Sequence, residues 1–322
     1  MDARRSKKTA ELLKVLSDLL KDTTAGDPMG RRGGWTDKRL DQIAEELKQW
    51  NIQVSPSTVR RLLHQLGYRL HANVKSLSKS HPDRDLQFQC IDKERRRFVR
   101  QCLPVISVDT KKKELVGNFK NPGRVWSLKP TPVMDHDFRS DAKGIATPYG
   151  IYDLGRNEGS MFVGTSHDTP AFAANNIARW WRGHGRKNYP GAKSLLILAD
   201  GGGSNGARVR AWKWELQEQV VNPYGLKVTV CHYPTGASKW NPVEHRLFSE
   251  ITKEWSGQPL VSFEAIAELI RGTKTKTGLR VSCRLVRRVF PTAQKVSDAQ
   301  MRLLSISPHP ILPVWNYTLS PK

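Results

Sequence analysis

The first 70 residues carry apolar positions at the spacing of amphipathic helices. One leucine-rich stripe lies within the first 20 residues, and two more cover residues 40–47 and 59–66. Glycine and proline over residues 23–34 separate the first stripe from the others. The last two are joined by a short turn, and Ser55 followed by Pro56 is typical of a helix start. This pattern predicts a helix-turn-helix.

Four polar residues lie on the exposed side of the last of these predicted helices: Ser57, Thr58, Arg60 and Arg61. In a DNA-binding helix-turn-helix, the N-terminal residues of the second helix face the bases of the major groove. We therefore predict that these four side chains contact DNA. An ordinary helical hairpin with a solvated basic face would give the same pattern, so the sequence leaves that alternative open.

The pattern changes after a basic connector that we assign to residues 71–102. Residues 103–257 show short apolar stretches and helices in the order β-β-β-α-β-α-β-α, which predicts an α/β domain with a mixed sheet. "RVWSL", residues 124–128, is the candidate for its second strand. The stretch 192–199, which is continuously apolar from Leu195 onward, is typical of a strand buried on both faces. We assign residues 258–322 to a C-terminal extension with one helix and an irregular, proline-rich tail.

The charge balance points to the partner. The chain of 322 residues has 53 Lys and Arg against 30 Asp and Glu, a net charge of +23. Such an excess indicates a polyanion, because each neutralised phosphate releases counterions. A generic basic protein is one alternative, and binding to anionic membrane is another, which the scattered basic residues disfavour.

Nothing in the sequence indicates a membrane or secreted protein. It contains no apolar run of about 18 residues, and its N-terminus lacks the apolar core of a secretory signal, so we expect no membrane partner and a cytoplasmic location. The four cysteines form no C-x-x-C pair and are expected to be reduced.

Three carboxylates stand at the ends of predicted elements. Asp109 ends the first strand, Asp200 ends the fourth, and Glu244 lies in the first turn of the helix after the fifth. The first and fourth strands of such a sheet can lie side by side, with that helix at their edge, so we predict that the three side chains meet. Clustered carboxylates repel one another, and Mg²⁺ is a usual reason to bring them together. Two such ions about 3.5–4 Å apart can support an in-line phosphoryl transfer.

Each of these acids also has a simpler explanation. Asp109 could pair with one of the three lysines that follow it, Asp200 could start a turn, and Glu244 could complete a capping box with Asn241. The glycine loop after Asp200 lacks the G-K-[ST] of a P-loop, but it leaves room for a bulky, charged group.

We rank other acids and histidines lower. Asp135, His136 and Asp137 are expected in a loop, and Asp153 lies before a hairpin turn. Asp168 is expected to be a local cap at the start of the helix that Thr169 and Pro170 open. His167 and His232 are expected to be structural groups, with His232 the candidate for orienting substrate.

Several long stretches resemble the ISAzo13 family of bacterial insertion-sequence transposases, DDE enzymes related to the IS630/Tc1-mariner group. They are "VISVDTKKKELVGNF", "HDFRSDAKGIATPYGIYDLGRNEG", "VGTSHDTPAFAANNIARWW", "LLILADGGGSNGARVRAWK" and "HYPTGASKWNPVEHRLFSEI". The stretches before residue 103 and the terminal "WNYTLSPK" also resemble that family. Relatives often begin further upstream with additional DNA-binding sequence, so a shortened copy is an alternative to an intact one.

The resemblance implies an RNase H-like fold with Asp109, Asp200 and Glu244 as its catalytic, metal-binding triad. The implied activity is DNA strand cleavage and strand transfer at the ends of an insertion sequence, with two Mg²⁺ ions per site, for which Mn²⁺ substitutes. The implied partners are terminal inverted repeats and target DNA, bound by a dimer or larger assembly at the bacterial nucleoid. Lys111 and Lys112 are expected to contact this DNA.

Two other functions fit the same residues. An RNase H-like, structure-specific nuclease would cut DNA without joining strands. A decayed, non-catalytic DNA-binding regulator would bind the ends without Mg²⁺-dependent nicking.

Overall fold

The computed structural model describes residues 3–21, 36, 38–71 and 81–322. The chain divides into two compact units, Met1–Ser76 and Leu77–Lys322. Within the described residues, no helix combines the length and apolar character needed to cross a membrane.

The first unit contains helices α1 (Ala3–Lys21), α2 (Leu40–Gln49) and α3 (Pro56–Gln65). The helix start predicted at Ser55 is present, because its Oγ accepts a hydrogen bond from the Thr58 backbone N–H at 3.3 Å. Apolar side chains of the three helices form one small core: Leu16, Leu20, Ile43, Ala44, Leu47, Val59 and Leu62. The sequence pattern thus correctly predicted the helix-turn-helix pair, here packed against α1.

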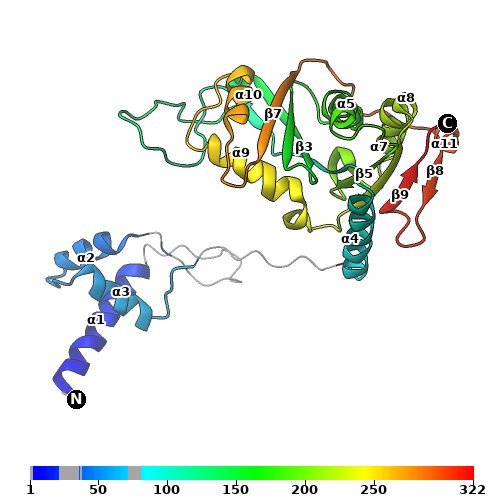
Figure 1. Ribbon diagram of the computed structural model, residues 1–322. Helices are drawn as coiled ribbons and strands as arrows, with labels where there is room; N and C mark the ends of the chain where they lie inside the picture. The colour runs from blue at the N-terminus through cyan, green and yellow to red at the C-terminus, as the bar shows by residue number, and fades with distance from the viewer. Residues whose placement is uncertain (1–2, 22–35, 37, 72–80) are drawn as a thin grey trace. The chain divides into compact units, whose positions relative to one another are not determined.

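The second unit is built on one mixed sheet with the strand order β7-β4-β3-β1-β5-β6-β9-β8, and β2 pairs with β3 (Figure 1). The strands are β1 (Val105–Thr110), β2 (Glu114–Val116), β3 (Gly144–Asp153), β4 (Glu158–Gly164), β5 (Ser194–Ala199), β6 (Lys227–His232), β7 (Arg280–Val286), β8 (Ile306–Pro308) and β9 (Asn316–Leu319). The antiparallel strands β1, β3 and β4 continue into β5 and β6, which run parallel to β1. This is the mixed sheet of an RNase H-like fold, as predicted.

Helices cover both faces of this sheet. Side chains of α5 and α7 pack on one face, while α4, α9 and α10 pack on the other face (Figure 1). Short π-helical turns extend three of the helical segments. The bounds are α4 (Arg84–Arg100), α5 (Pro170–Trp180), η2 (Trp181–Gly185), α6 (Arg186–Asn188), α7 (Arg210–Leu216), η4 (Gln217–Val221), α8 (Asn222–Tyr224), η6 (Glu244–Phe248), α9 (Ser249–Glu254), α10 (Phe263–Gly272) and α11 (Asp298–Arg302).

Two segments differ from the sequence-based expectations. "RVWSL" forms no strand, and its Trp126 is fully exposed; the second strand is Glu114–Val116 instead. The end of the chain is not an irregular tail, because Asn316–Leu319 is a buried strand that pairs antiparallel with β6. Residues beyond 257 therefore extend both edges of the sheet, with β7 on one side and β9 and β8 on the other.

Candidate active site

The parallel pairing of β1 with β5 places Asp109 and Asp200 next to each other. Val108 is aligned with Ala199, and each carboxylate follows directly after its member of this pair. Neighbouring strands lie about 4.8 Å apart. The two acids therefore extend from adjacent strand ends, as their positions in the sequence predicted.

A buried serine ties the helix that carries Glu244 to the same strand. The Ser107 hydroxyl donates to the Asn241 Oδ1 and accepts a hydrogen bond from the Val243 backbone N–H at 3.1 Å. Ser107 and Asn241 are completely buried. Because side chains two residues apart in a strand share a face, Ser107 anchors η6 on the face toward which Asp109 points.

The capping box considered for Glu244 is absent. The Asn241 side chain is bonded to Ser107, and the Glu244 backbone N–H donates to the Asn241 carbonyl at 3.0 Å. No side-chain cap forms at the start of η6. The Glu244 carboxylate is consequently available to the space beside the strand ends.

All three carboxylates line one cleft with a volume of about 470 Å³. Burial raises the pKa of Asp109 to about 7, and the nearby carboxylates of Asp200, Glu244 and Asp168 add to this shift. Burial also raises the pKa of Glu244, an effect that Lys111 opposes and Asp200 strengthens. The cleft thus gathers negative charges that disfavour one another's ionisation.

Asp168 is a fourth carboxylate that lines this cleft, and it is not the local helix cap that the sequence predicts. The cap of α5 is Thr169, whose Oγ1 accepts from the Phe172 N–H at 3.2 Å. Asp168 instead accepts a hydrogen bond from the Thr110 hydroxyl at 3.1 Å, directly after Asp109. The signal was present in the sequence: Thr169 and Pro170 already accounted for the helix start, which left Asp168 without a structural role.

His232 supports Asp200 from inside the protein. Its ring is fully buried, and Nδ1 lies 3.1 Å from the Asp200 carbonyl oxygen. A carbonyl oxygen can only accept, so Nδ1 carries the proton and Nε2 accepts from the Tyr317 hydroxyl at 3.4 Å. Burial lowers the pKa of His232 to about 4, which keeps the ring neutral. His232 therefore holds the Asp200 backbone and does not reach the cleft.

The two lysines predicted to contact DNA have different environments. Lys111 is 8% exposed, forms a 3.3 Å ion pair with Glu114, and lies 4.5 Å from the centre of the Trp255 ring. Lys112 also lines the cleft but is exposed. Within the described ranges no lysine forms an ion pair with Asp109. A salt bridge to one of the three lysines that follow it therefore does not explain the carboxylate at this position.

The residues proposed for DNA recognition in the first unit lie on α3. Ser57, Arg60 and Arg61 are exposed, and Thr58 is half-buried. In the part of the chain that the structure describes, neither arginine forms an ion pair with a carboxylate. Their guanidinium groups face solvent.

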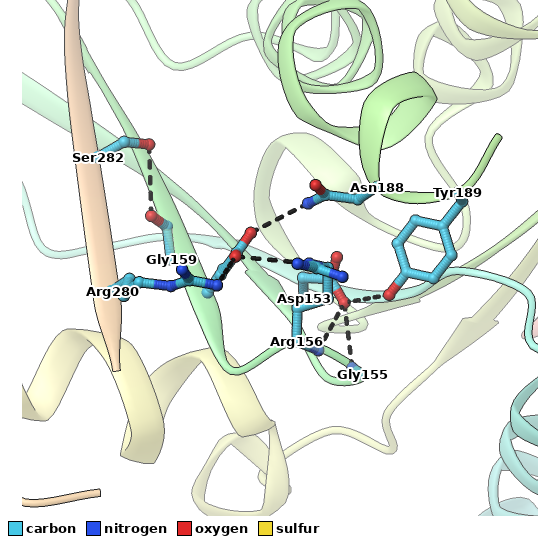
Figure 2. Close-up of polar contacts among 9 residues, drawn as sticks. Asp153, Gly155, Arg156, Gly159, Asn188, Tyr189, Arg280 and Ser282 are labelled. Atoms are coloured by element: carbon cyan, nitrogen blue, oxygen red, sulfur yellow. Dashed lines mark hydrogen bonds and ion pairs between the residues drawn. The ribbon is translucent and has the colours of Figure 1, made fainter. Parts of the chain in front are cut away.

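The competing acids lie elsewhere. Asp153 is buried at the β3–β4 turn, where Oδ1 accepts from the Gly155 and Arg156 N–H groups and, at 2.7 Å, from the Tyr189 hydroxyl (Figure 2). It is aligned with Ile106, so it lies toward the other end of β1 from Asp109. The exposed loop residues Asp135, His136 and Asp137 are not among those that line the cleft.

The cleft offers the donor chemistry of a divalent-cation site. Carboxylate oxygens are the ligands that Mg²⁺ prefers, and a cation would offset the repulsion that raises the pKa of Asp109. Ser204 also lines the cleft, and its buried Oγ has no hydrogen-bond partner. Nevertheless, the described residues contain no group of three or more His, Cys, Asp or Glu side chains placed to hold a metal ion together. The donor atoms suit a divalent cation chemically, but their side chains are not arranged as a metal site.

The sheet and this cleft define a carboxylate site on an RNase H-like fold. The chain belongs to the family described as the Rhodopirellula transposase DDE domain, whose sequence model matches residues 15–321. This confirms the transposase resemblance found in the sequence. No curated protein sequence matches the chain.

Solved structures of Mos1 transposase are similar to this chain at low identity. They include the paired-end complex with the left transposon end, at 15% identity and a TM-score of 0.43, covering 80% of this chain and 68% of that chain. The Mos1 strand transfer complex has 16% identity and a TM-score of 0.44 with the same coverage. The mariner Mos1 paired-end complex with Mg has 14% identity and a TM-score of 0.43, covering 79% and 68% of the two chains.

Replacing Asp109 by Asn should stabilise the metal-free protein at high pH. The folded-state pKa of about 7 exceeds the ordinary value of 3.8, so ionising Asp109 costs stability, and that loss develops as the pH rises from about 4 through 7. We expect a gain in unfolding free energy of at most about 4 kcal/mol at pH 8.5, since one pKa unit corresponds to about 1.4 kcal/mol. Urea unfolding in EDTA checks this, and the gain should shrink toward pH 4. Equal stability of both proteins at pH 8.5 would contradict the electrostatic cost.

Replacing Ser107 by Ala should loosen η6 from β1. The change leaves the Asn241 side chain and the Val243 N–H without their buried partner, which costs about 1–3 kcal/mol for each unsatisfied group. We expect lower stability in urea unfolding and weaker Mn²⁺ binding in calorimetric titration. The matched control is Ser282→Ala, because Ser282 makes only longer hydrogen bonds, of 3.2 and 3.5 Å, on β7. Mn²⁺ affinity reduced equally in both variants would show that Ser107 does not position Glu244.

Proposed function

We propose that this chain is a metal-dependent DNA transposase that cleaves strands at the ends of an insertion sequence and transfers them to target DNA. The observation that carries the proposal is the single cleft in which β1, β5 and η6 bring together Asp109, Asp200 and Glu244. Family membership indicates the substrate class, and the net charge of +23 is consistent with a DNA partner.

In this proposal, Asp109, Asp200 and Glu244 would be the ligands of two Mg²⁺ ions, for which Mn²⁺ would substitute. Such ions, when bound, activate an attacking oxygen and stabilise a leaving oxygen in phosphoryl transfer. Neutral His232 keeps the Asp200 backbone in place, and Ser107 keeps η6 beside β1. The Lys111 ammonium lies close enough to Glu244 to favour its ionised form.

The reaction consists of two phosphoryl transfers. Water attacks the phosphodiester at the element's end, which leaves a free 3′-OH and a 5′-phosphate. The 3′-OH then attacks a phosphodiester of the target, forming one new P–O bond and breaking another. No covalent protein–DNA intermediate is needed, because each step exchanges one oxygen at phosphorus for another.

The glycine loop supports the approach of a DNA backbone. A Cβ added at Gly202 would meet no atom within 4 Å, and the φ of −118° at this residue suits any amino acid. Neither packing nor backbone conformation therefore requires glycine at this position in the cleft. We attribute this glycine to the space that a phosphate group needs. The exposed Lys112, which lines the same cleft, offers a positive charge.

The first unit would supply recognition of the terminal inverted repeats. We propose that α3 enters the major groove and that Ser57, Thr58, Arg60 and Arg61 contact the DNA. The buried ion pair of Lys111 favours Lys112 over Lys111 as a DNA contact in the second unit. Pairing of two ends requires at least a dimer on DNA, and we place the reaction at the nucleoid in the cytoplasm.

Replacing Asp200 by Ala should abolish strand cleavage and leave DNA-end binding nearly intact. The change removes a proposed cation ligand but leaves α3 unaltered. Incubation with the element's own end DNA and Mg²⁺ or Mn²⁺, followed by a denaturing gel, measures cleavage, and a gel shift in EDTA measures binding. Asp137→Ala is the matched control, because Asp137 is exposed and outside the cleft.

The same assay separates the alternatives. A pre-cleaved end that the protein joins to target DNA supports a transposase, whereas cutting without joining indicates a nuclease. End binding without any Mg²⁺-dependent nicking indicates a DNA-binding regulator. Unchanged cleavage in the Asp200 variant would overturn the proposed mechanism.

A further inference from the structure

Four arginines form a cluster outside the cleft, at one edge of the sheet. Arg179 lies at the end of α5, Arg182 lies in η2, and Arg284 lies on β7. Arg288 follows the end of β7, which is the edge strand beside β4. We refer to these four residues as the arginine track. Arg182, Arg284 and Arg288 are exposed and Arg179 is half-buried.

The other three members of the arginine track lie within electrostatic reach of Arg179. Burial lowers the pKa of Arg179, and the guanidinium groups of Arg182, Arg284 and Arg288 lower it further. Arg284 reaches from β7 to η2, because its Nη2 atom lies 3.9 Å from the position that a Cβ at Gly183 would occupy. Four positive charges are thus held together on one surface, where like charges repel.

In the described ranges, no member of the arginine track forms an ion pair with a carboxylate. Two other arginines on the same segment do: Arg280 pairs with Glu158 at 2.5 Å, and Arg287 pairs with Glu264.

Structural roles account for only part of the arginine track. A basic residue at a helix C-terminus interacts favourably with the helix dipole, which explains Arg179 alone. Charges on an edge strand discourage aggregation, but Arg280 already supplies one on β7. Neither role explains four clustered positive charges, whereas binding of a polyanion would make use of them.

The arginine track begins beside the cleft. The Ser166 hydroxyl donates to the Arg288 carbonyl at 3.3 Å, and the Thr165 N–H donates to the Val286 carbonyl at 3.2 Å. Ser166 lies two residues before Asp168, which lines the cleft. From there the arginine track follows β7 and η2 to the far end of α5, a helix of 11 residues. At about 1.5 Å per residue, that helix alone spans roughly 16 Å.

We propose that the arginine track binds the phosphate backbone of the DNA duplex that leads away from the cleft. This inference rests on the proposed function, because it takes DNA as the substrate of the cleft. Guanidinium groups suit such a role, since they remain charged and bind phosphate oxygens in pairs. The contacts carry no base specificity and would position the duplex for the reaction.

The test compares two double variants of the full chain. Arg284→Gln with Arg288→Gln removes two members of the arginine track, and Arg280→Gln with Arg287→Gln removes two ion-paired arginines of the same segment. Binding of a random-sequence duplex is measured by fluorescence anisotropy in EDTA over a range of KCl concentrations. Each lost phosphate contact reduces the slope of log K against log[salt] by about 1, so the first variant should lose about 2 and the second nothing.

The readout distinguishes this inference from the proposed function. Binding in EDTA is measured without the cations that strand cleavage would require, and the carboxylates and α3 are the same in all proteins compared. Arg182→Gln with Arg284→Gln serves as a second variant, and it should also lose about 2 in slope. Equal slopes for wild type and both track variants, or the same loss in the ion-paired control, would contradict the proposal that the arginine track binds DNA. Neither result would bear on strand cleavage, which has its own assay.

Discussion

The parallel pairing of β1 with β5 is the constraint on which the candidate site depends. It sets two carboxylates side by side at the ends of buried strands, where neither can move away from the other. The remaining supports act on the same place. Ser107 ties η6 to β1, and His232 holds the Asp200 carbonyl from within the core. A slip of one residue in this pairing would move a strand's side chains to the other face and separate the carboxylates.

The cluster of carboxylates around Asp109 lowers the stability of the folded protein near neutral pH. Asp109 is half-buried among other carboxylates, and its pKa of about 7 expresses the free energy that its ionisation costs near neutral pH. The core of the second unit, which packs helices on both faces of the sheet, tolerates this cost. The arginine track likewise holds charges of the same sign close together. Both features become favourable only when a partner of opposite charge is bound.

Much of the fold and of the candidate site could be predicted because local signals and topology agree. The apolar stretches that end at Val108 and Ala199 indicated strands, and their order predicted that Asp109 and Asp200 would be neighbours. What escaped prediction depends on long-range contacts. The link from Ser107 to Asn241 joins residues 134 apart, and β9 is recognisable as a strand only through its pairing with β6. Asp168 was assigned to the helix start, although its neighbour Thr169 forms the cap.

The most direct test of the account is an anomalous difference map from crystals of the protein soaked in Mn²⁺. The account predicts density for cations inside the cleft, within coordinating distance of Asp109, Asp200 and Glu244, and its loss in crystals of the Asp109→Asn variant. A map of well-ordered wild-type crystals with no peak in this cleft, or with peaks only elsewhere, would contradict the claim that the three carboxylates converge to hold metal ions.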